Sequence, residues 1–375
     1  MYDRWLQRDG RGLVGAKEGH STAKVSRQQE DELIRTENLA DSAEFLQTSR
    51  IAEALGRRLE RDQRYTYIGD ILLAVNPPSV DEKFLEGLES SEPHIVNMVR
   101  GIRSKMLHFR QPQLLLTAGW EGSGRANIYS AALRTLLHTG TGTRAAVCSK
   151  IAAADSVLAA FTSRGDTASP VVRVTRVWHN THGAVTGAHF SSCHAAAATE
   201  LAAAWRQYEI FDVVIAGLRG RGQASVREHG LEHVIQEDAV TQQDAARLGQ
   251  FRQLVARLQL LGFRPEHGLS VVLRVTASIV LLLRLAEATG PAPGLVRAVA
   301  SNLEVDPALL QRSLTSLSTT ARPSFTREQS SLGRSAASMA RLLYTALLDW
   351  MEHFINTQLR LRSVPCCGRT RESKL

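Results

Sequence analysis

The stretch that most constrains this chain is a glycine-rich segment at residues 114–127, which reads LLLTAGWEGSGRAN. Three leucines lead into the glycines, and helix-forming residues follow from Asn127 to Leu137. A strand, a glycine loop and a helix in this order predict a phosphate-binding loop, because backbone N–H groups and the helix N-terminus attract anions together. The spacing over residues 119–126 matches G-x-x-x-x-G-K-[ST].

The two chemically active positions of that pattern are changed. Arg125 stands where a lysine is expected, and Ala126 stands where the hydroxyl that binds Mg²⁺ is expected. Arginine is larger and forked, and alanine offers a metal no oxygen, so Mg²⁺ as a cofactor is doubtful. The residues predicted to form the nucleotide-binding loop are Gly119, Trp120, Glu121, Gly122, Ser123, Gly124, Arg125 and Ala126.

The composition indicates a globular chain with an excess of basic residues. The 375 residues are 43% hydrophobic and 22% charged, which is enough to bury a large core. The net charge of +8 favours an acidic partner, such as an actin filament, a nucleic acid or a membrane surface, without choosing among them. We predict no transmembrane segment, because the most apolar run, at residues 275–283, is too short to span a bilayer and is typical of a buried helix.

Regular elements are predicted on both sides of the glycine loop. The apolar spacing in residues 39–59 predicts one or two amphipathic helices, and the apolar run at 65–75 predicts a strand that Asn76 and Pro77 end. A helix is predicted at 93–107 because proline stands at its first position.

Eight segments, in the correct order, resemble motifs of the myosin motor head. Each is weak alone, but the eight in order are a strong signal, and the resemblance as a whole covers about residues 36–362. The segments are RYTYIGDILLAVNP (64–77), PHI (93–95), the glycine loop (119–126), HGAVTGAHF (182–190), YEIFDVVIAG (208–217), LGFRPE (261–266), a VA…L-x-V pattern (295–314) and YTALLDWMEHFINTQL (344–359).

This resemblance implies a fold and a domain organisation. The implied fold is α/β, with a P-loop NTPase-like partial central sheet flanked by helices and a mostly helical second half. A flexible leader would occupy residues 1–35, a motor-like domain 36–362 and a divergent tail 363–375. Within the domain, the P-loop and sheet would lie in residues 36–194 and the mainly helical region in 195–362.

The resemblance also implies a function. The family consists of ATP-dependent actin motors, so ATP or ADP would be the ligand, actin the partner, and the location cytoplasmic and cytoskeleton-associated. Asn76 and Pro77 would join the loop as nucleotide-binding residues on the purine side. No specific nucleic-acid partner is expected, since no motif that reads RNA or DNA is present.

Departures from the family predict weak chemistry. The stretch that matches switch I, GDTASP at 165–170, keeps one matching hydroxyl, Ser169, a weak candidate metal ligand, and has Pro170 at the arginine position. Switch II and the main actin-binding region that follow in the family have no counterpart here. We therefore predict a truncated pseudoenzyme: a pseudo-motor with residual nucleotide or actin binding and little or no hydrolysis. Whether it is an enzyme at all stays open.

Other hypotheses remain open. The first alternative is a non-enzymatic interaction or scaffold module that docks a protein partner, such as the complementary half of a motor head, through an incomplete fold. The chain could also bind nucleic acid nonspecifically through its charge, or fail to fold alone. Ser373, Lys374 and Leu375 match a peroxisomal targeting tripeptide, which makes the peroxisome an alternative location.

Two further predictions concern side-chain placement. Four histidines at 179, 182, 189 and 194 are predicted to lie on the surface of a hairpin rather than to bind a metal. A stripe at helical spacing on the last motif is predicted to face the core: Met339, Leu343, Leu347, Trp350 and Phe354.

Overall fold

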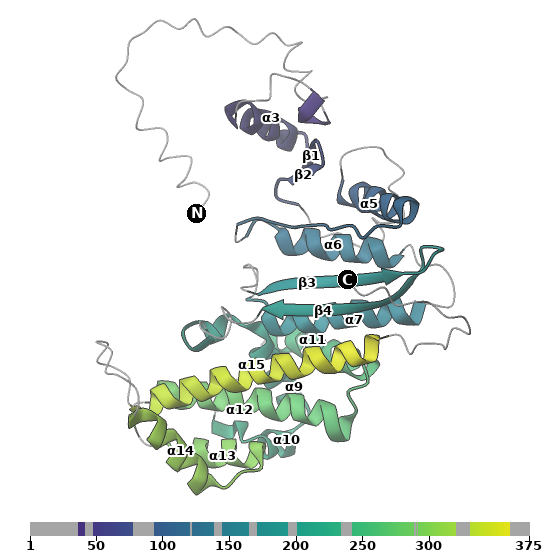
Figure 1. Cartoon of the computed structure of the whole chain (residues 1–375). Coiled ribbons are helices and arrows are strands. Elements are labelled where there is room, and N and C mark those ends of the chain that lie inside the picture. The colour runs from purple at the N-terminus through teal and green to yellow at the C-terminus, as the bar shows by residue number, and fades with distance from the viewer. Residues whose placement is uncertain are drawn as a thin grey trace, which may run out of the picture. The chain divides into compact units, whose positions relative to one another are not determined.

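The structure, a computed structural model shown in Figure 1, divides into two compact units. They comprise residues 1–75 and 76–375 and are described separately. The residues whose structure is described are 37–41, 48–77, 94–120, 122–138, 145–164, 171–193, 201–233, 242–288, 290, 292–319 and 331–360. The predicted leader at 1–35 and tail at 363–375 lie outside these residues, and the expected division at residue 194 stays a prediction.

The first unit contains a short helical turn, η1 (Leu39–Asp41), the helix α3 (Thr48–Glu60) and a hairpin of β1 (Tyr65–Ile68) with β2 (Ile71–Ala74). The apolar run predicted as one strand is therefore two antiparallel strands. Gly69 adopts φ +60 at the turn between them, a conformation that glycine reaches without steric cost. The predicted amphipathic helix is confirmed in α3, whose buried Arg58 donates a hydrogen bond to the Tyr65 carbonyl at 3.2 Å.

The second unit is mostly helical and carries one described hairpin. Its elements are α5 (Ile95–Phe109), α6 (Arg125–His138), α7 (Ala145–Thr162), β3 (Val172–His179), β4 (Val185–Cys193), η3 (Trp205–Gln207), α9 (Glu209–Gly220), α10 (Gln223–Glu228), η4 (Leu231–His233), α11 (Gln242–Leu260), η5 (Pro265–Leu269), α12 (Ser270–Glu287), α13 (Pro293–Leu303), α14 (Pro307–Thr319) and α15 (Ser331–Leu359).

The helix α12 forms the centre of the core. Its residues 279–283 are all buried, and it packs against α9, α13 and α15. The prediction of a buried helix at 275–283 is confirmed. Two helical segments, residues 145–162 and 265–287, are long and apolar enough to cross a membrane by length and composition, and most of the second is buried inside the protein. Burial against neighbouring helices explains the apolar character of α12.

The buried face of α15 differs from the predicted stripe. Of the five stripe residues only Leu347 is buried, whereas Trp350 is exposed and the other three lie at the edge of the core. The fully buried positions include Ala340, Tyr344 and Met351. Tyr344 fixes this orientation, because its hydroxyl donates a hydrogen bond of 2.7 Å to the carbonyl of Phe161 on α7.

The expected central sheet is not formed by the described residues. They contain two separate two-stranded antiparallel sheets, β1–β2 and β3–β4. Residues 111–120, which contain the predicted strand before the glycine loop, have no strand structure, and Leu114 and Leu116 are 85% and 81% exposed. A strand requires a neighbouring strand to pair its backbone groups, and no described segment pairs with this one. The mostly helical second half is observed.

Candidate nucleotide-binding loop

The glycine loop turns as its spacing predicts. Gly122 and Gly124 have φ of +77 and +82, and the Ser123 N–H donates to the Trp120 carbonyl at 3.2 Å. These φ values lie in the left-handed region that only glycine adopts readily. The helix α6 begins at Arg125, two residues earlier than predicted, so its first turn follows the loop directly.

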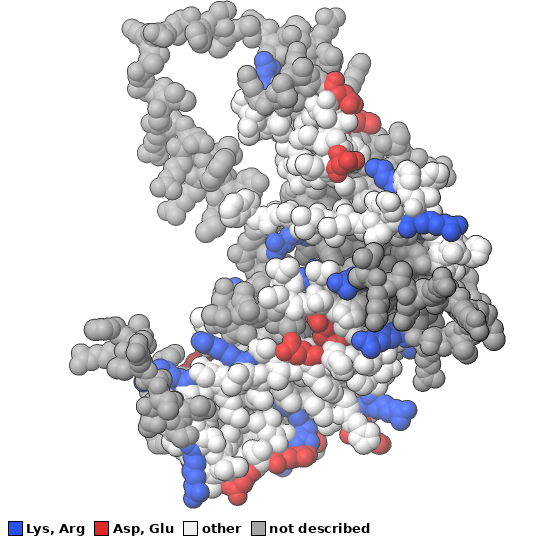
Figure 2. Space-filling model, viewed as in Figure 1, with Lys and Arg blue, Asp and Glu red and all other residues white. Residues whose placement is uncertain are grey.

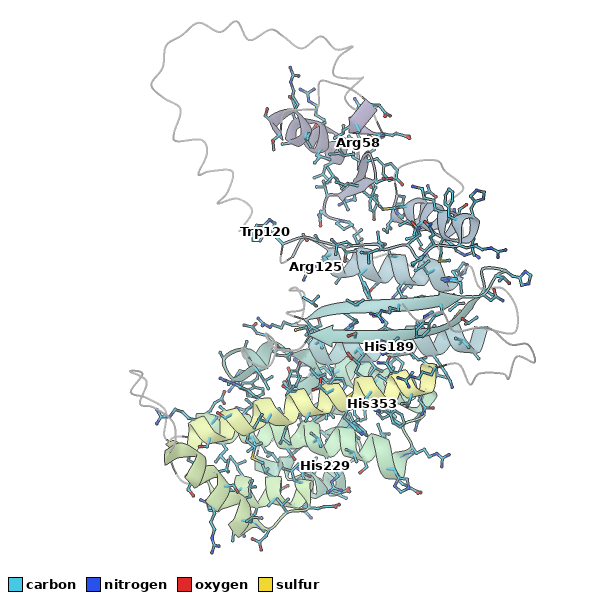
Figure 3. All side chains as sticks on the ribbon, viewed as in Figure 1. Arg58, Trp120, Arg125, His189, His229 and His353 are labelled. Carbon is cyan, nitrogen blue, oxygen red and sulfur yellow. The ribbon has the colours of Figure 1, made fainter. Side chains whose placement is uncertain are left out.

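Arg125 reaches back across the loop. Its Nη1 atom donates to the carbonyl of Gly119 at 3.4 Å. Gly119 packs closely against Ser123, so a Cβ at position 119 would collide with the Ser123 hydroxyl. Figure 3 shows Arg125 at the start of α6 and Trp120 on the loop, where the indole is 90% exposed. The first and last parts of the loop are therefore joined by the side chain that replaces the expected lysine.

The Asn-Pro turn lies against the loop. A Cβ on Gly124 would lie 2.7 Å from Pro77 Cγ, so this glycine is required for the proline ring to pack there. The Asn127 side-chain amide donates to the Pro77 carbonyl at 3.4 Å, and Asn76 adopts φ +45. The structure thus brings together two segments that the sequence predicted as one site, although 40 or more residues separate them.

The donor atoms near the loop do not form a Mg²⁺ site. Ala126 is exposed and contributes only a methyl group at the position where the metal would need a hydroxyl. The described residues contain no group of three or more His, Cys, Asp or Glu side chains that could hold a metal. Ser169 and Glu121 lie outside the described residues, as does the whole switch I counterpart. Within the described part of the chain, the donor set does not suit Mg²⁺.

A half-buried network of polar side chains that joins α6, α7 and β3 was not predicted. Tyr129 shares a hydrogen bond of 2.6 Å with the Thr175 hydroxyl, and burial raises the pKa of Tyr129 to about 12. Arg173 donates to Asp155 at 2.8 Å and to Thr162 at 3.2 Å, which joins β3 to α7. Burial raises the pKa of Asp155, and Arg173 partly opposes this rise. The sequence carried no signal for this arrangement, because Val172 and Val174 alternate with Arg173 and Thr175 and would be expected to face inward, whereas in the structure the two valines are exposed and the two polar residues are half-buried.

The segment of the sequence that contains the loop has an excess of basic residues. Residues 94–193 contain eleven Lys and Arg against three Asp and Glu, which accounts for the whole net charge of +8. The described residues between 94 and 138 include no carboxylate side chain. Figure 2 shows basic side chains over the part of the surface that α5 and α6 occupy. This region would therefore attract an anion.

The histidines are less exposed than predicted. His182 is exposed at the turn, but His179 and His189 are half-buried on the two strands. Burial, with Arg103 nearby, lowers the pKa of His179, and neither of its ring nitrogens has a hydrogen-bond partner in the described part of the chain. The hairpin packs against α7 and α15, which is why its histidines are not all at the surface. His194 lies outside the described residues.

The described residues combine a glycine loop that opens a helix, an Asn-Pro turn packed on that loop and a mostly helical second half. Comparison with known families identifies the family, because residues 36–366 match the model of the myosin head (motor domain). The chain therefore belongs to the myosin motor-domain family.

Individual relatives agree with this assignment. Unconventional myosin-XV from Homo sapiens is 27% identical over 84% of this chain, and myosin-IIIb from Mus musculus is 25% identical over 91% of it. A shorter match, 28% identical over 26% of the chain, is to neither inactivation nor afterpotential protein C from Drosophila melanogaster. The chain spans 10% of the length of myosin-XV and 28% of that of myosin-IIIb.

Proposed function

We propose that this member of the myosin head family is a pseudo-motor that retains weak binding of ATP or ADP and has little or no hydrolytic activity. The observation that carries this proposal is Ala126, whose exposed methyl group occupies the position of the Mg²⁺-binding hydroxyl. Phosphoryl transfer depends on a metal ion that neutralises the charge developing on the phosphate oxygens. A loop that cannot hold the metal loses that stabilisation.

Residual binding is supported by the geometry that remains. Gly122 and Gly124 keep the backbone turn, and the N-terminus of α6 follows at once. Arg125 adds a forked cation that suits phosphate oxygens as a bidentate donor. By its resemblance to the family motif, the Asn76–Pro77 turn would lie on the purine side of the nucleotide, and in this chain Pro77 packs on the loop at Gly124.

The family also suggests a partner and a place. Actin is the partner we propose, and the cytoplasmic cytoskeleton is the location. The comparisons do not support the peroxisomal alternative, and residues 373–375 lie outside the described residues.

Two assays of the purified full chain test the pseudo-motor. We expect ATP or ADP to raise the midpoint of thermal unfolding, because a ligand that binds only the folded state stabilises it by mass action. We expect no ATP turnover above a protein-free blank, with or without actin filaments. A variant that restores the family residues, Arg125→Lys with Ala126→Thr, is the matched comparison for both assays. Robust actin-stimulated turnover by the unaltered chain would exclude the proposal.

A second candidate function is a module that docks a protein partner, and the exposed segment before the loop favours it. Leu114 and Leu116 are exposed on a stretch without strand pairing, and the outer face of β3 exposes Val172, Val174 and Trp178. Apolar surface of this kind marks interaction sites. The complementary half of a motor head would cover it.

Size-exclusion chromatography and titration with a recombinant complementary motor fragment test this second function. We expect the two pieces to co-elute, and we expect Leu114→Ser with Leu116→Ser to abolish co-elution while leaving the helical circular dichroism unchanged. A folded monomer that does not co-elute with the fragment would contradict the docking function.

A further inference from the structure

We propose that the loop binds polyphosphate groups free of Mg²⁺, so that the metal weakens ligand binding instead of supporting it. This inference rests on the proposed residual binding and adds the ionic form of the ligand. The ligands concerned share one chemistry, a chain of two or more phosphates, whether on a nucleoside or as inorganic pyrophosphate.

The first argument is the poor fit of the metal. Mg²⁺ demands near-octahedral oxygen ligands and is normally shared between phosphate and protein oxygens. Ala126 supplies none. Asp155, the one carboxylate described between residues 94 and 193, forms an ion pair with Arg173 at 2.8 Å, and its side chain is 13% exposed. The described residues therefore hold no cluster of His, Cys, Asp or Glu side chains that would bind a metal brought in on the ligand.

The second argument is the cation that the loop does supply. The Arg125 guanidinium lies over the loop and donates to the Gly119 carbonyl through Nη1. A guanidinium offers five N–H donors in a fixed fork and matches pairs of phosphate oxygens. A Mg²⁺ ion on the same phosphates would compete for those oxygens and repel the guanidinium.

The third argument is the surrounding charge. The eleven basic and three acidic residues in 94–193 give this region the whole excess charge of the chain. Coordination of Mg²⁺ cancels two negative charges of a polyphosphate. The attraction between the region and its ligand is therefore stronger when the metal is absent.

Isothermal titration calorimetry on the full chain tests the inference. ATP, ADP and pyrophosphate are titrated in EDTA and in saturating Mg²⁺, at the same pH and ionic strength. We expect Kd to be about tenfold lower in EDTA, a difference of about 1.4 kcal/mol. If pyrophosphate shows the same preference, the phosphate chain is the recognised group, and if only the nucleotides bind, the base is needed as well. Both results fit the inference as long as EDTA strengthens binding.

Two variants assign the effect to the loop. Arg125→Ala should weaken binding in EDTA at least tenfold and remove the Mg²⁺ effect, whereas Arg134→Ala, which removes one charge from the exposed side of the same helix, should change Kd less than twofold. Arg125→Lys with Ala126→Thr should reverse the metal preference. Circular dichroism checks that each variant is folded. If Arg125→Ala does not fold, the metal preference of Arg125→Lys with Ala126→Thr provides the test instead.

The outcomes separate the two proposals. Tighter binding in Mg²⁺ by the unaltered chain overturns this inference and leaves residual nucleotide binding intact. Equal weakening by Arg125→Ala and Arg134→Ala shows diffuse attraction to the basic surface and also overturns it. Absence of binding in both buffers overturns the residual binding itself, and this inference with it.

Discussion

The side-chain amide of Asn356 makes both of its hydrogen bonds to the backbone of one residue, Phe190. Oδ1 accepts from the Phe190 N–H at 2.9 Å, and Nδ2 donates to the Phe190 carbonyl at 2.8 Å. Phe190 is paired opposite Thr175 in the hairpin, and its own N–H and carbonyl point away from β3. Asn356 on α15 thus satisfies the free edge of β4 as a neighbouring strand would, across 166 residues of sequence.

Replacing Asn356 with leucine should destabilise the protein strongly. The substitution keeps the side-chain size but leaves the buried N–H and carbonyl of Phe190 without partners, at about 1–3 kcal/mol for each group. We expect the free energy of unfolding in urea to fall by about 2–5 kcal/mol. Gln358→Leu, an exposed amide on the same helix, is the control and should change it by about 0.5 kcal/mol or less. If the two substitutions lowered the unfolding free energy equally, the hydrogen bonds from Asn356 to Phe190 would make no specific contribution to stability.

The pair Asp155–Arg173 should behave as a buried ion pair. Both side chains are about one-eighth exposed, with Nη1 and Oδ1 2.8 Å apart. Arg173→Met alone leaves the carboxylate buried without its cation, and we expect a loss of about 3–5 kcal/mol of unfolding free energy. The double variant Asp155→Leu with Arg173→Met should recover most of it. Additive losses in this double-mutant cycle would show that the two side chains act independently.

Gly217 on α9 should not tolerate a methyl group. A Cβ at this position would collide with the ring of Phe251 on α11, which is itself buried. We expect Gly217→Ala to lower the thermal unfolding midpoint and to cost about 1–3 kcal/mol through overpacking. Phe251→Leu in the same chain should relieve part of that cost.

A glycine on the facing helix provides the matched control. Gly249 lies on α11, and a Cβ there would meet nothing within 4 Å. Gly249→Ala should therefore raise stability by up to about 1 kcal/mol, since alanine is the better helix former. A loss of stability at Gly249 as large as that at Gly217 would show that packing against Phe251 is not the cause.

His94 should contribute a pH-dependent part of the stability. Burial lowers its pKa from 6.5 to about 4, and its Nδ1 accepts a hydrogen bond from the Val96 N–H as the cap of α5. As the pH falls below 6.5, His94 takes up a proton in the unfolded chain but not in the folded chain. The stability that is present above pH 6.5 is therefore lost as the pH falls toward 4. The full effect is up to about 3 kcal/mol.

Replacing His94 with asparagine separates capping from titration. Asparagine is a good helix cap and does not ionise in this range, so the unfolding free energy should fall less steeply between pH 6.5 and 4. Gly101→Ala, at an exposed position of the same helix that carries no ionisable group and has open space beside it, should leave the slope unchanged. Urea unfolding at several pH values checks both variants. An unchanged slope in the His94 variant would contradict the assignment.

Much of the candidate site could be predicted because it depends on neighbouring residues. Glycines at 122 and 124 turn the chain, and a helix begins directly after them. The order of short motifs also identified the family that the comparisons show. The contact of Asn76 and Pro77 with the loop followed only from resemblance, since no local rule brings together segments so far apart.

The wrong predictions concern residues whose structure depends on contacts with segments far away in the sequence. Leucines at 114–116 have the composition of a buried strand, yet a strand forms only where another strand supplies its hydrogen bonds. The stripe on α15 has helical spacing, but the rotation of that helix is set by Tyr344 reaching Phe161 and by Asn356 reaching Phe190. His179 and His189 were predicted to lie on the surface of the hairpin, but helices pack against the hairpin and the two side chains are half-buried.

Residue identities alone were enough to predict the turn of the glycine loop, the loss of a metal-binding hydroxyl at Ala126 and the family. These depend on the identity of residues within a few positions, and local backbone geometry follows from them. Three contacts became visible only in the folded chain. Arg125 donates a hydrogen bond across the loop to Gly119, Arg173 forms an ion pair with Asp155, and Asn356 bonds to the free edge of β4. Burial and hydrogen bonding between distant segments depend on how the whole chain packs, and no short window of sequence contains that information.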